Sequence, residues 1–436
     1  MQKFIAFMDK YVVPVAGKIG SQRHLVAVRD GFIAVMPLII IGSLATLVNT
    51  LPIDVFQNFM KDLFGDTWKQ IGGGMWTGSF AILALLVAIG VSYNLAKSYG
   101  IDALSAAIIT FGSLIVISPT TPKEGGLDFA WTGAQGLFVS IITALVVTEL
   151  FRFLLQKNIT IKMPESVPPA VIKSFAALLP ATIILFIVAS IQLAVKLADT
   201  SIHQMVFETI QMPLQGLAAT LPSAIIVALL VHVLWFFGLH GPNILGGIID
   251  PIYLPALEKN IKQFGEGVSA FDVPYIFTKP FFDVFIYMGG SGATLAFLVA
   301  IFIVAKSSQL RAMNRVSFTP GLFNINEPVI FGTPIVLNPI LFIPFVFTPV
   351  VLVITTYIAM ATGLVPKTVA LVPWNIPPIF SGYLATGGSI RGILLQLFNF
   401  TIAVAMYLPF VLMCDRTYVR AEKTANQTGN DSSVQM

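Results

Sequence analysis

Long apolar runs alternate with short polar segments along most of the chain. A helix needs about 20 consecutive apolar residues to cross a bilayer. Nine runs approach or exceed that length, and they lie at 31–49, 76–96, 101–117, 135–154, 175–195, 221–239, 285–305, 338–362 and 391–414. Three further apolar stretches, at 241–262, 321–337 and 373–390, are interrupted by glycine and proline. The pattern predicts an all-α polytopic membrane protein with about ten transmembrane helices and re-entrant or broken hairpins.

Composition supports this class and excludes others. Of 436 residues, 56% are hydrophobic and 11% charged, whereas soluble domains carry about 25% charged residues. The single cysteine, Cys414, excludes a disulfide framework. The four histidines are scattered and no P-loop pattern occurs, so we expect no metal, no nucleotide or other cofactor, and no nucleic-acid partner.

The placement of lysine and arginine predicts the orientation. Basic residues cluster at 3–29, Lys97, 152–173, 306–315 and 416–423, and short basic loops are cytoplasmic by the positive-inside rule. These clusters can share one side only if 241–262 forms an additional, tenth crossing. Both termini are then cytoplasmic, and no cleavable signal peptide is evident.

Broken segments concentrate in the second half of the chain, where transporters place binding sites. We therefore expect residues 31–205 to form a five-helix scaffold and dimerisation half and 206–415 a substrate-binding transport core, within a single domain overall. Residues 1–30 are expected to form a cytoplasmic amphipathic segment. Residues 416–436 are expected to form a cytoplasmic tail that is disordered from 421 onward.

Glu327 is the main candidate for chemistry. It lies in FNINEPVIFGTP (323–334), between two asparagines and a proline. A carboxylate at membrane depth costs about 2.5–3.5 kcal/mol, so it is retained for a reason. It could act as a general base, as a proton carrier or as a structural partner of a buried cation. The amides of Asn324 and Asn326 suit sugar hydroxyls, because each offers donors and acceptors.

His240 is the second candidate. It lies in WFFGLHGPN (235–243), where Gly241 and Pro242 end the helix beside it and open backbone to a cavity. Trp235 and Asn243 flank the same break. His232, in mid-helix, is expected to be a packing residue.

A second aromatic break occurs at VPWNIPP (372–378). Trp374 beside Asn375 could stack on a pyranose while the amide reads hydroxyls. A membrane-interface tryptophan is the alternative, and that second interpretation is expected for Trp68 and Trp76. Gly289–Gly292 either allows close helix contacts or brings backbone amides near a ligand.

The chain resembles the enzyme IIC component of the bacterial phosphotransferase system in three segments: FNINEPVIFGTP, WFFGLHGPN and YMGGSGATL (287–295). Within it they most resemble the lactose/cellobiose family, and the cellobiose or diacetylchitobiose permeases in particular. The resemblance extends from Gly20 to the last span.

The resemblance implies a homodimer of ten-helix protomers in the bacterial plasma membrane. It implies that a β-linked disaccharide is bound, phosphorylated by a separate phosphorylated IIB protein and released inside. The binding-site glutamate and histidine of the family fall on Glu327 and His240, and the motif asparagines on Asn324 and Asn326. Trp374 is a weaker correspondence.

No IIA or IIB domain is evident in the chain, and Cys414 at the end of the last span is expected to be a packing residue. The donor is expected to dock on the basic cytoplasmic face that includes Arg23, Arg29, Arg311 and Arg315, although positive-inside topology alone also explains these charges. A proton-coupled secondary sugar transporter and a passive channel or receptor remain the alternatives.

Overall fold

The protein is described here by a computed structural model that covers residue 10 and residues 13–50, 53–65, 67–121, 126–164, 167–333 and 335–433. The predicted N-terminal segment lies mostly outside these residues, as does Pro334. Within the described residues the chain forms helices and no strand, with one isolated bridge between Thr120 and Leu127. The predicted all-α membrane class is confirmed.

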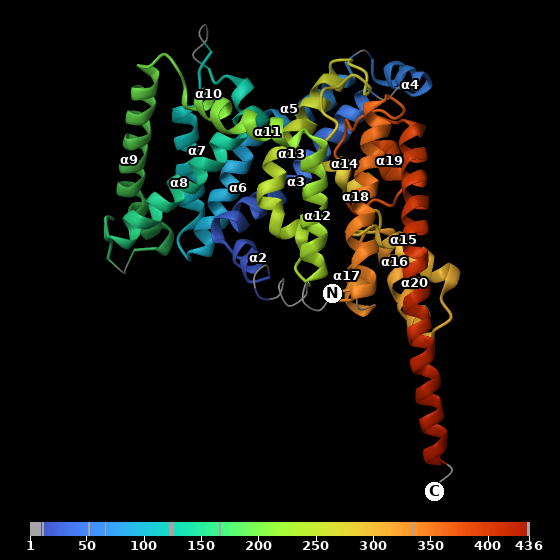
Figure 1. Ribbon diagram of the computed structural model, residues 1–436. Coiled ribbons are helices and arrows are strands. Elements are labelled where there is room, and N and C mark those ends of the chain that lie inside the picture. Colours follow the sequence, from blue (N-terminus) through green and yellow to red (C-terminus); the bar gives the residue numbers. More distant parts are fainter. Residues whose placement is uncertain are drawn as a thin grey trace.

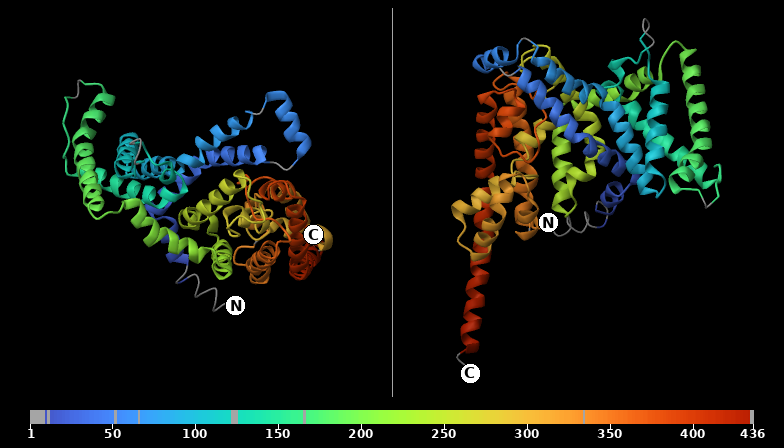
Figure 2. Two further views of the ribbon diagram at one scale, coloured as in Figure 1. Left: turned by 90° about the horizontal axis from the view of Figure 1, so that it is seen from above. Right: turned by 180° about the vertical axis from the view of Figure 1, so that it is seen from behind.

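The first half of the chain forms a curved wall of helices, coloured blue to green in Figures 1 and 2. Its elements are α2 (Val13–Gly20), α3 (Arg23–Thr50), α4 (Asp54–Phe64), α5 (Lys69–Thr77), η2 (Phe80–Ile82), α6 (Leu83–Ser98), α7 (Ala103–Ile117), η3 (Phe129–Trp131), η4 (Ala134–Gly136), α8 (Leu137–Gln156), α9 (Pro169–Lys196), α10 (Ile202–Val206), η5 (Phe207–Gln211) and α11 (Met212–Ala218).

The second half packs into a denser bundle beside this wall (Figure 2). Its elements are α12 (Leu221–Phe236), α13 (Gly241–Gly265), α14 (Lys279–Phe285), α15 (Thr294–Val304), α16 (Ser308–Leu322), α17 (Glu327–Gly332), α18 (Pro339–Ala361), α19 (Phe380–Ala385) and α20 (Ile390–Ser433).

Six helices in the described residues are long and apolar enough to cross a membrane, or seven if the α10–α11 segment and α12, bent by 82°, are counted as one span. Helices α7 and α15 are apolar but shorter. The predicted continuous crossing at 285–305 is wrong. A glycine-rich loop separates α14 from α15 there, because Gly289, Gly290 and Gly292 adopt positive φ angles that end a helix.

Helix α13 joins the two halves. Its Leu254, Leu257 and Ile261 are buried in one apolar cluster with Phe32 and Ile39 of α3. Close approach is possible because Gly247 faces α3, where a Cβ atom would lie 2.6 Å from the carbonyl oxygen of Leu25. The wall and the bundle therefore contact each other where α3 packs on α13.

Two helices extend away from the rest. Only 11% of the apolar window of α9 is buried, and the helix stands apart at the edge of the molecule (Figure 1). Helix α20 continues as a single helix to Ser433, so the structure places a helix where a disordered tail was predicted.

Candidate functional site

Two irregular loops meet at the centre of the bundle. The amide of Asn324 accepts a hydrogen bond from the backbone N–H of Gly289 and donates to the carbonyls of Trp374 and Ile376. Asn326 donates to the carbonyl of Ser291 over 2.9 Å. The asparagines that precede Glu327 thus fasten its loop to the glycine-rich loop and to the Trp374 segment.

Glycine at position 290 is required by this contact. A Cβ atom there would lie 2.6 Å from Cγ of Asn326, and the residue has a φ angle of +96° that L side chains rarely adopt. The glycine therefore allows the backbone of this loop to pack closely against the Asn326 side chain. The approach of its amides to a ligand stays a prediction.

His240 is held at the first turn of α13. Its Nδ1 accepts a hydrogen bond from the backbone N–H of Asn243 over 3.2 Å, so it caps the helix. Gly241 allows the sharp turn from α12, because a Cβ atom there would lie 2.2 Å from the carbonyl oxygen of Val231. Since Nδ1 accepts, the neutral ring carries its proton on Nε2.

Glu327 faces that nitrogen. Its Oε1 lies 3.9 Å from Nε2 of His240, and the two side chains are 49% and 38% exposed. Glu327 is the first residue of α17, which fixes its position relative to the loop. The Trp235 ring packs against the imidazole, with 4.5 Å between ring centroids, and is only 2% exposed. Trp235 therefore supports His240 more than it offers an open stacking surface.

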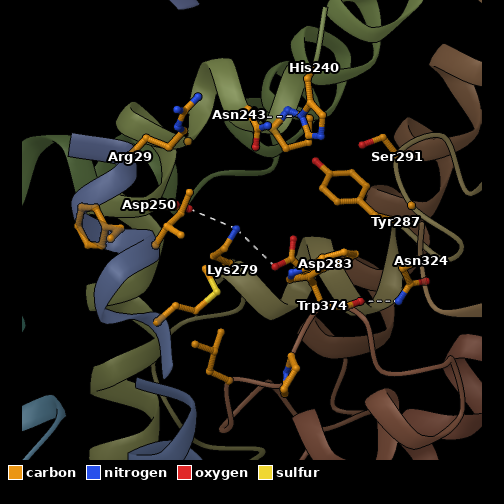
Figure 3. Close-up of a pocket in the computed structure, with 18 of the residues that line it drawn as sticks. Arg29, His240, Asn243, Asp250, Lys279, Asp283, Tyr287, Ser291, Asn324 and Trp374 are labelled. Atoms are coloured by element: carbon orange, nitrogen blue, oxygen red, sulfur yellow. Dashed lines mark hydrogen bonds and ion pairs between the residues drawn. The ribbon is translucent and has the colours of Figure 1, made fainter. Parts of the chain in front are cut away.

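These residues line one cavity of about 420 Å³, which lies within the usual range for small-molecule sites of about 300–1,000 Å³. Six regions of the chain form its wall: α3, the end of α12, the first half of α13, α14 with the glycine-rich loop, the loop at 324–327, and the Trp374 segment. Figure 3 shows His240, Tyr287, Asn324 and Trp374 around this space. We call it the central cavity.

A largely buried charge cluster forms part of the wall. Nζ of Lys279 lies 3.3 Å from Oδ1 of Asp250 and 3.4 Å from Oδ2 of Asp283 (Figure 3). This cluster escaped the sequence-based predictions. The available signal was charge inside apolar sequence, since Lys279 and Asp283 lie four residues apart within FTKPFFDVFIYM (277–288).

Arg29 lines the central cavity and pairs with Asp30 over 2.7 Å. Its place on a docking face stays a prediction. The contribution of α3 also goes beyond the expected scaffold role, because Phe32, Met36 and Ile40 of that helix line the same cavity.

Most predicted site residues meet here. The central cavity is lined by Glu327, His240, Asn243, Asn324, Asn326, Trp235 and Trp374. Asn375 does not line the cavity; it is exposed beside Trp374. The direct roles of these residues toward a ligand remain predictions. For Asn324 both amide N–H groups are already used by backbone carbonyls.

Two residues predicted to pack do so. Cys414 is 4% exposed, and His232 is fully buried beside Tyr287 and Phe345. The Nδ1 atom of His232 bonds the carbonyl of Ala228 within its own helix.

The family described as Phosphotransferase system, EIIC matches residues 29–349. The chain is 45% identical to the PTS system cellobiose-specific EIIC component of Geobacillus stearothermophilus, over 98% of each chain. It is 42% identical to the Lichenan permease IIC component of Bacillus subtilis (strain 168), over 97% of this chain and 96% of that one.

A solved structure is also similar. The transporter ChbC, described as the IIC component from the N,N'-diacetylchitobiose-specific phosphotransferase system, superposes with a TM-score of 0.91 at 45% identity, covering 96% of this chain and 99% of that one. Helical architecture, family match and near full-length identity agree: this chain belongs to the EIIC family of the phosphotransferase system.

Proposed function

We propose that the protein binds a β-linked disaccharide, cellobiose or N,N'-diacetylchitobiose, in the central cavity and carries it across the plasma membrane as it is phosphorylated by a phosphorylated IIB protein. Similarity to the cellobiose-specific component and to ChbC supports these two sugars. The cavity supports them as well, because it combines an exposed tryptophan, Trp374, with polar groups that suit hydroxyls.

The observation that carries the proposal is the 3.9 Å gap between His240 Nε2 and Glu327 Oε1. The gap is too long for a direct hydrogen bond, but one hydroxyl oxygen fits at about 2.8 Å from both atoms. Such a hydroxyl accepts the Nε2 proton of neutral His240 and donates its own proton to the Glu327 carboxylate. A sugar hydroxyl in this position is held with a base already aligned to it.

A hydroxyl held in this way can accept the phosphoryl group. As the sugar oxygen bonds to phosphorus, its proton passes to Glu327, the P–S bond of the donor phosphocysteine breaks, and the IIB thiolate leaves. Proton removal of this kind contributes roughly 10²–10⁴-fold in rate. Positioning supplies much of the remainder in phosphoryl transfer, and His240 provides part of it.

The donor thiol belongs to another protein in this proposal. The one cysteine of the sequence, Cys414, is 4% exposed and cannot meet a sugar in the cavity. Arg311 and Arg315 are exposed on α16, which leads directly into the Glu327 loop. We therefore place the IIB docking surface on this helix, with both termini of the chain on the same cytoplasmic side.

Homodimerisation is part of the proposal. Helix α9 is apolar, little buried, and packs mainly on α7. Phe186, at its centre, is 73% exposed. A second protomer would cover this surface, in agreement with the predicted dimerisation half.

Reconstitution tests the function. Purified protein in vesicles is supplied with labelled cellobiose or diacetylchitobiose, with and without phosphorylated IIB. Sugar phosphate that appears only with the donor supports the proposal and names the substrate. Free sugar that accumulates on an imposed proton gradient without donor would instead make the protein a symporter with Glu327 as its proton carrier.

A further inference from the structure

A second cavity lies at the other end of the α3–α13 interface. Its volume is about 240 Å³, a little over half that of the central cavity. The side chains that matter are Thr46, Asn49 and Thr50 of α3, Trp76 of α5, Lys262 of α13, and Glu266 just after α13. We call it the outer pocket.

The two cavities share two helices. On α3 the central cavity reaches Ile40 and the outer pocket begins at Thr46; on α13 the corresponding residues are Leu254 and Ile261. At 1.5 Å rise per residue, six residues on α3 and seven on α13 separate them by about 9–10.5 Å. The two walls give similar separations, so the pockets lie in line along one interface.

Buried residues lie between the two cavities. Leu257 is fully buried there, as is Ser43, whose Oγ accepts a hydrogen bond from the backbone N–H of Leu371. Leu371 is 5% exposed. This contact ties the segment that carries Trp374 to α3 at a position between the two cavities.

The outer pocket has the chemistry of a sugar site. The hydroxyls of Thr46 and Thr50 donate to helix carbonyls, so their lone pairs remain as acceptors toward the cavity. Asn49 uses one N–H on the carbonyl of Lys69 and keeps the other. The half-buried Trp76 offers a ring face that suits the apolar side of a pyranose.

The charges favour a neutral ligand. Lys262, in the last turn of α13, and Glu266, directly after that helix, are both exposed and have opposite charges. A phosphate group would meet repulsion from the carboxylate, whereas a polyol can donate to Glu266 and accept from Lys262. Gly72 brings α5 against this set, because a Cβ atom there would lie 2.4 Å from Nδ2 of Asn49.

We propose that the outer pocket is a second, weaker sugar site, which receives one ring of the disaccharide on the outer face before the Ser43–Leu371 contact opens toward the central cavity. The inference rests on the proposed function. It assigns Trp76 a binding role in place of the interfacial role expected from the sequence.

Kinetics separate the two sites. With phosphorylated IIB inside, Trp76→Ala should raise the KM for uptake of external disaccharide about tenfold, the size expected for a lost stacking contact, and Trp76→Phe should recover most of it. Phosphorylation of the same sugar by protein in detergent should keep its KM, because the central cavity is then reached without crossing the outer pocket. Equal changes in both assays, or no change in uptake, would overturn the proposal.

Labelling provides a direct readout. Asn49→Cys in a Cys414→Ala background should react with an impermeant maleimide added outside, and millimolar disaccharide should slow the reaction. The same protection is expected when Met36→Trp fills the central cavity. Absence of protection, or protection that disappears with Met36→Trp, would show that the outer pocket binds no sugar. A wild-type protein that makes no sugar phosphate would instead contradict the proposed function.

Discussion

Lys279 on α14 lies 3.3 Å from Asp250 on α13, and this ion pair connects the bundle to the helix that packs on the wall. Asp250 is nearly buried, with a side chain 8% exposed, and Lys279 is 23% exposed. Buried ions of this kind depend on each other, because a single partner left behind is not solvated. The pair therefore fixes how α14 and α13 meet at the central cavity.

Lys279→Met should lower the free energy of unfolding by about 3–5 kcal/mol, the cost of an uncompensated buried charge. The measurement is thermal unfolding in detergent, with the exposed Lys259→Met as matched control. Adding Asp250→Asn to Lys279→Met should recover part of the loss. A single variant as stable as the control would mean that the carboxylates are solvated through the cavity.

Glu327→Gln should reduce the rate of sugar phosphorylation by roughly 10²–10⁴-fold, since the amide cannot accept the hydroxyl proton. Sugar binding should stay close to wild type, because size and hydrogen-bonding capacity are kept. Equilibrium binding and phosphorylation by phosphorylated IIB are compared in one preparation. Glu208→Gln, at an exposed residue, serves as control. A wild-type phosphorylation rate in Glu327→Gln would rule out a general-base role for Glu327.

Two substitutions at His240 separate its two contacts. His240→Ala removes both the cap on the Asn243 amide and the donor facing Glu327. It should lose about 0.5–2 kcal/mol of stability along with activity. His240→Asn keeps a good N-cap acceptor but has a shorter reach, so stability should return while phosphorylation stays low. If His240→Asn restored both stability and phosphorylation, helix capping alone would explain the role of His240.

Asn324→Ala should destabilise the site even though the residue is half-buried. It removes the acceptor of the Gly289 amide and the donors to Trp374 and Ile376. Of these groups the Gly289 amide belongs to a buried residue, and an unsatisfied buried group costs about 1–3 kcal/mol. Asn375→Ala serves as the control, because this exposed amide does not line the cavity. It should change the free energy of unfolding by less than about 0.5 kcal/mol. Unfolding midpoints and sugar affinity are measured for both.

Phe186→Arg should convert the proposed homodimer to monomer, because it places a charge at the centre of the exposed face of α9. The molar mass of the detergent-solubilised protein, measured by light scattering after gel filtration, gives the result. Phe302→Arg on α15, at a side chain 79% exposed, is the matched control. A dimer that persists in Phe186→Arg would move the interface away from α9.

Local pattern determined a large part of this protein. Apolar runs with few charges are stable only as helices in a bilayer, so the membrane class followed from the sequence. Gly241, Pro242 and the asparagines around Glu327 break helices by their own backbone preferences, so the positions of these two loops followed too. Motif resemblance then paired Glu327 with His240 before any distance was known.

Tertiary packing decided what no local pattern encodes. Arg29, Asp250 and Lys279 reach one cavity only because α3 packs on α13 and α14 packs beside it, over more than 200 residues of chain. The same packing gave Asn324 its three backbone partners and kept Asn375 out of the cavity. Helical periodicity fixes which residues share a face of one helix, but the face that meets a distant helix depends on the whole bundle.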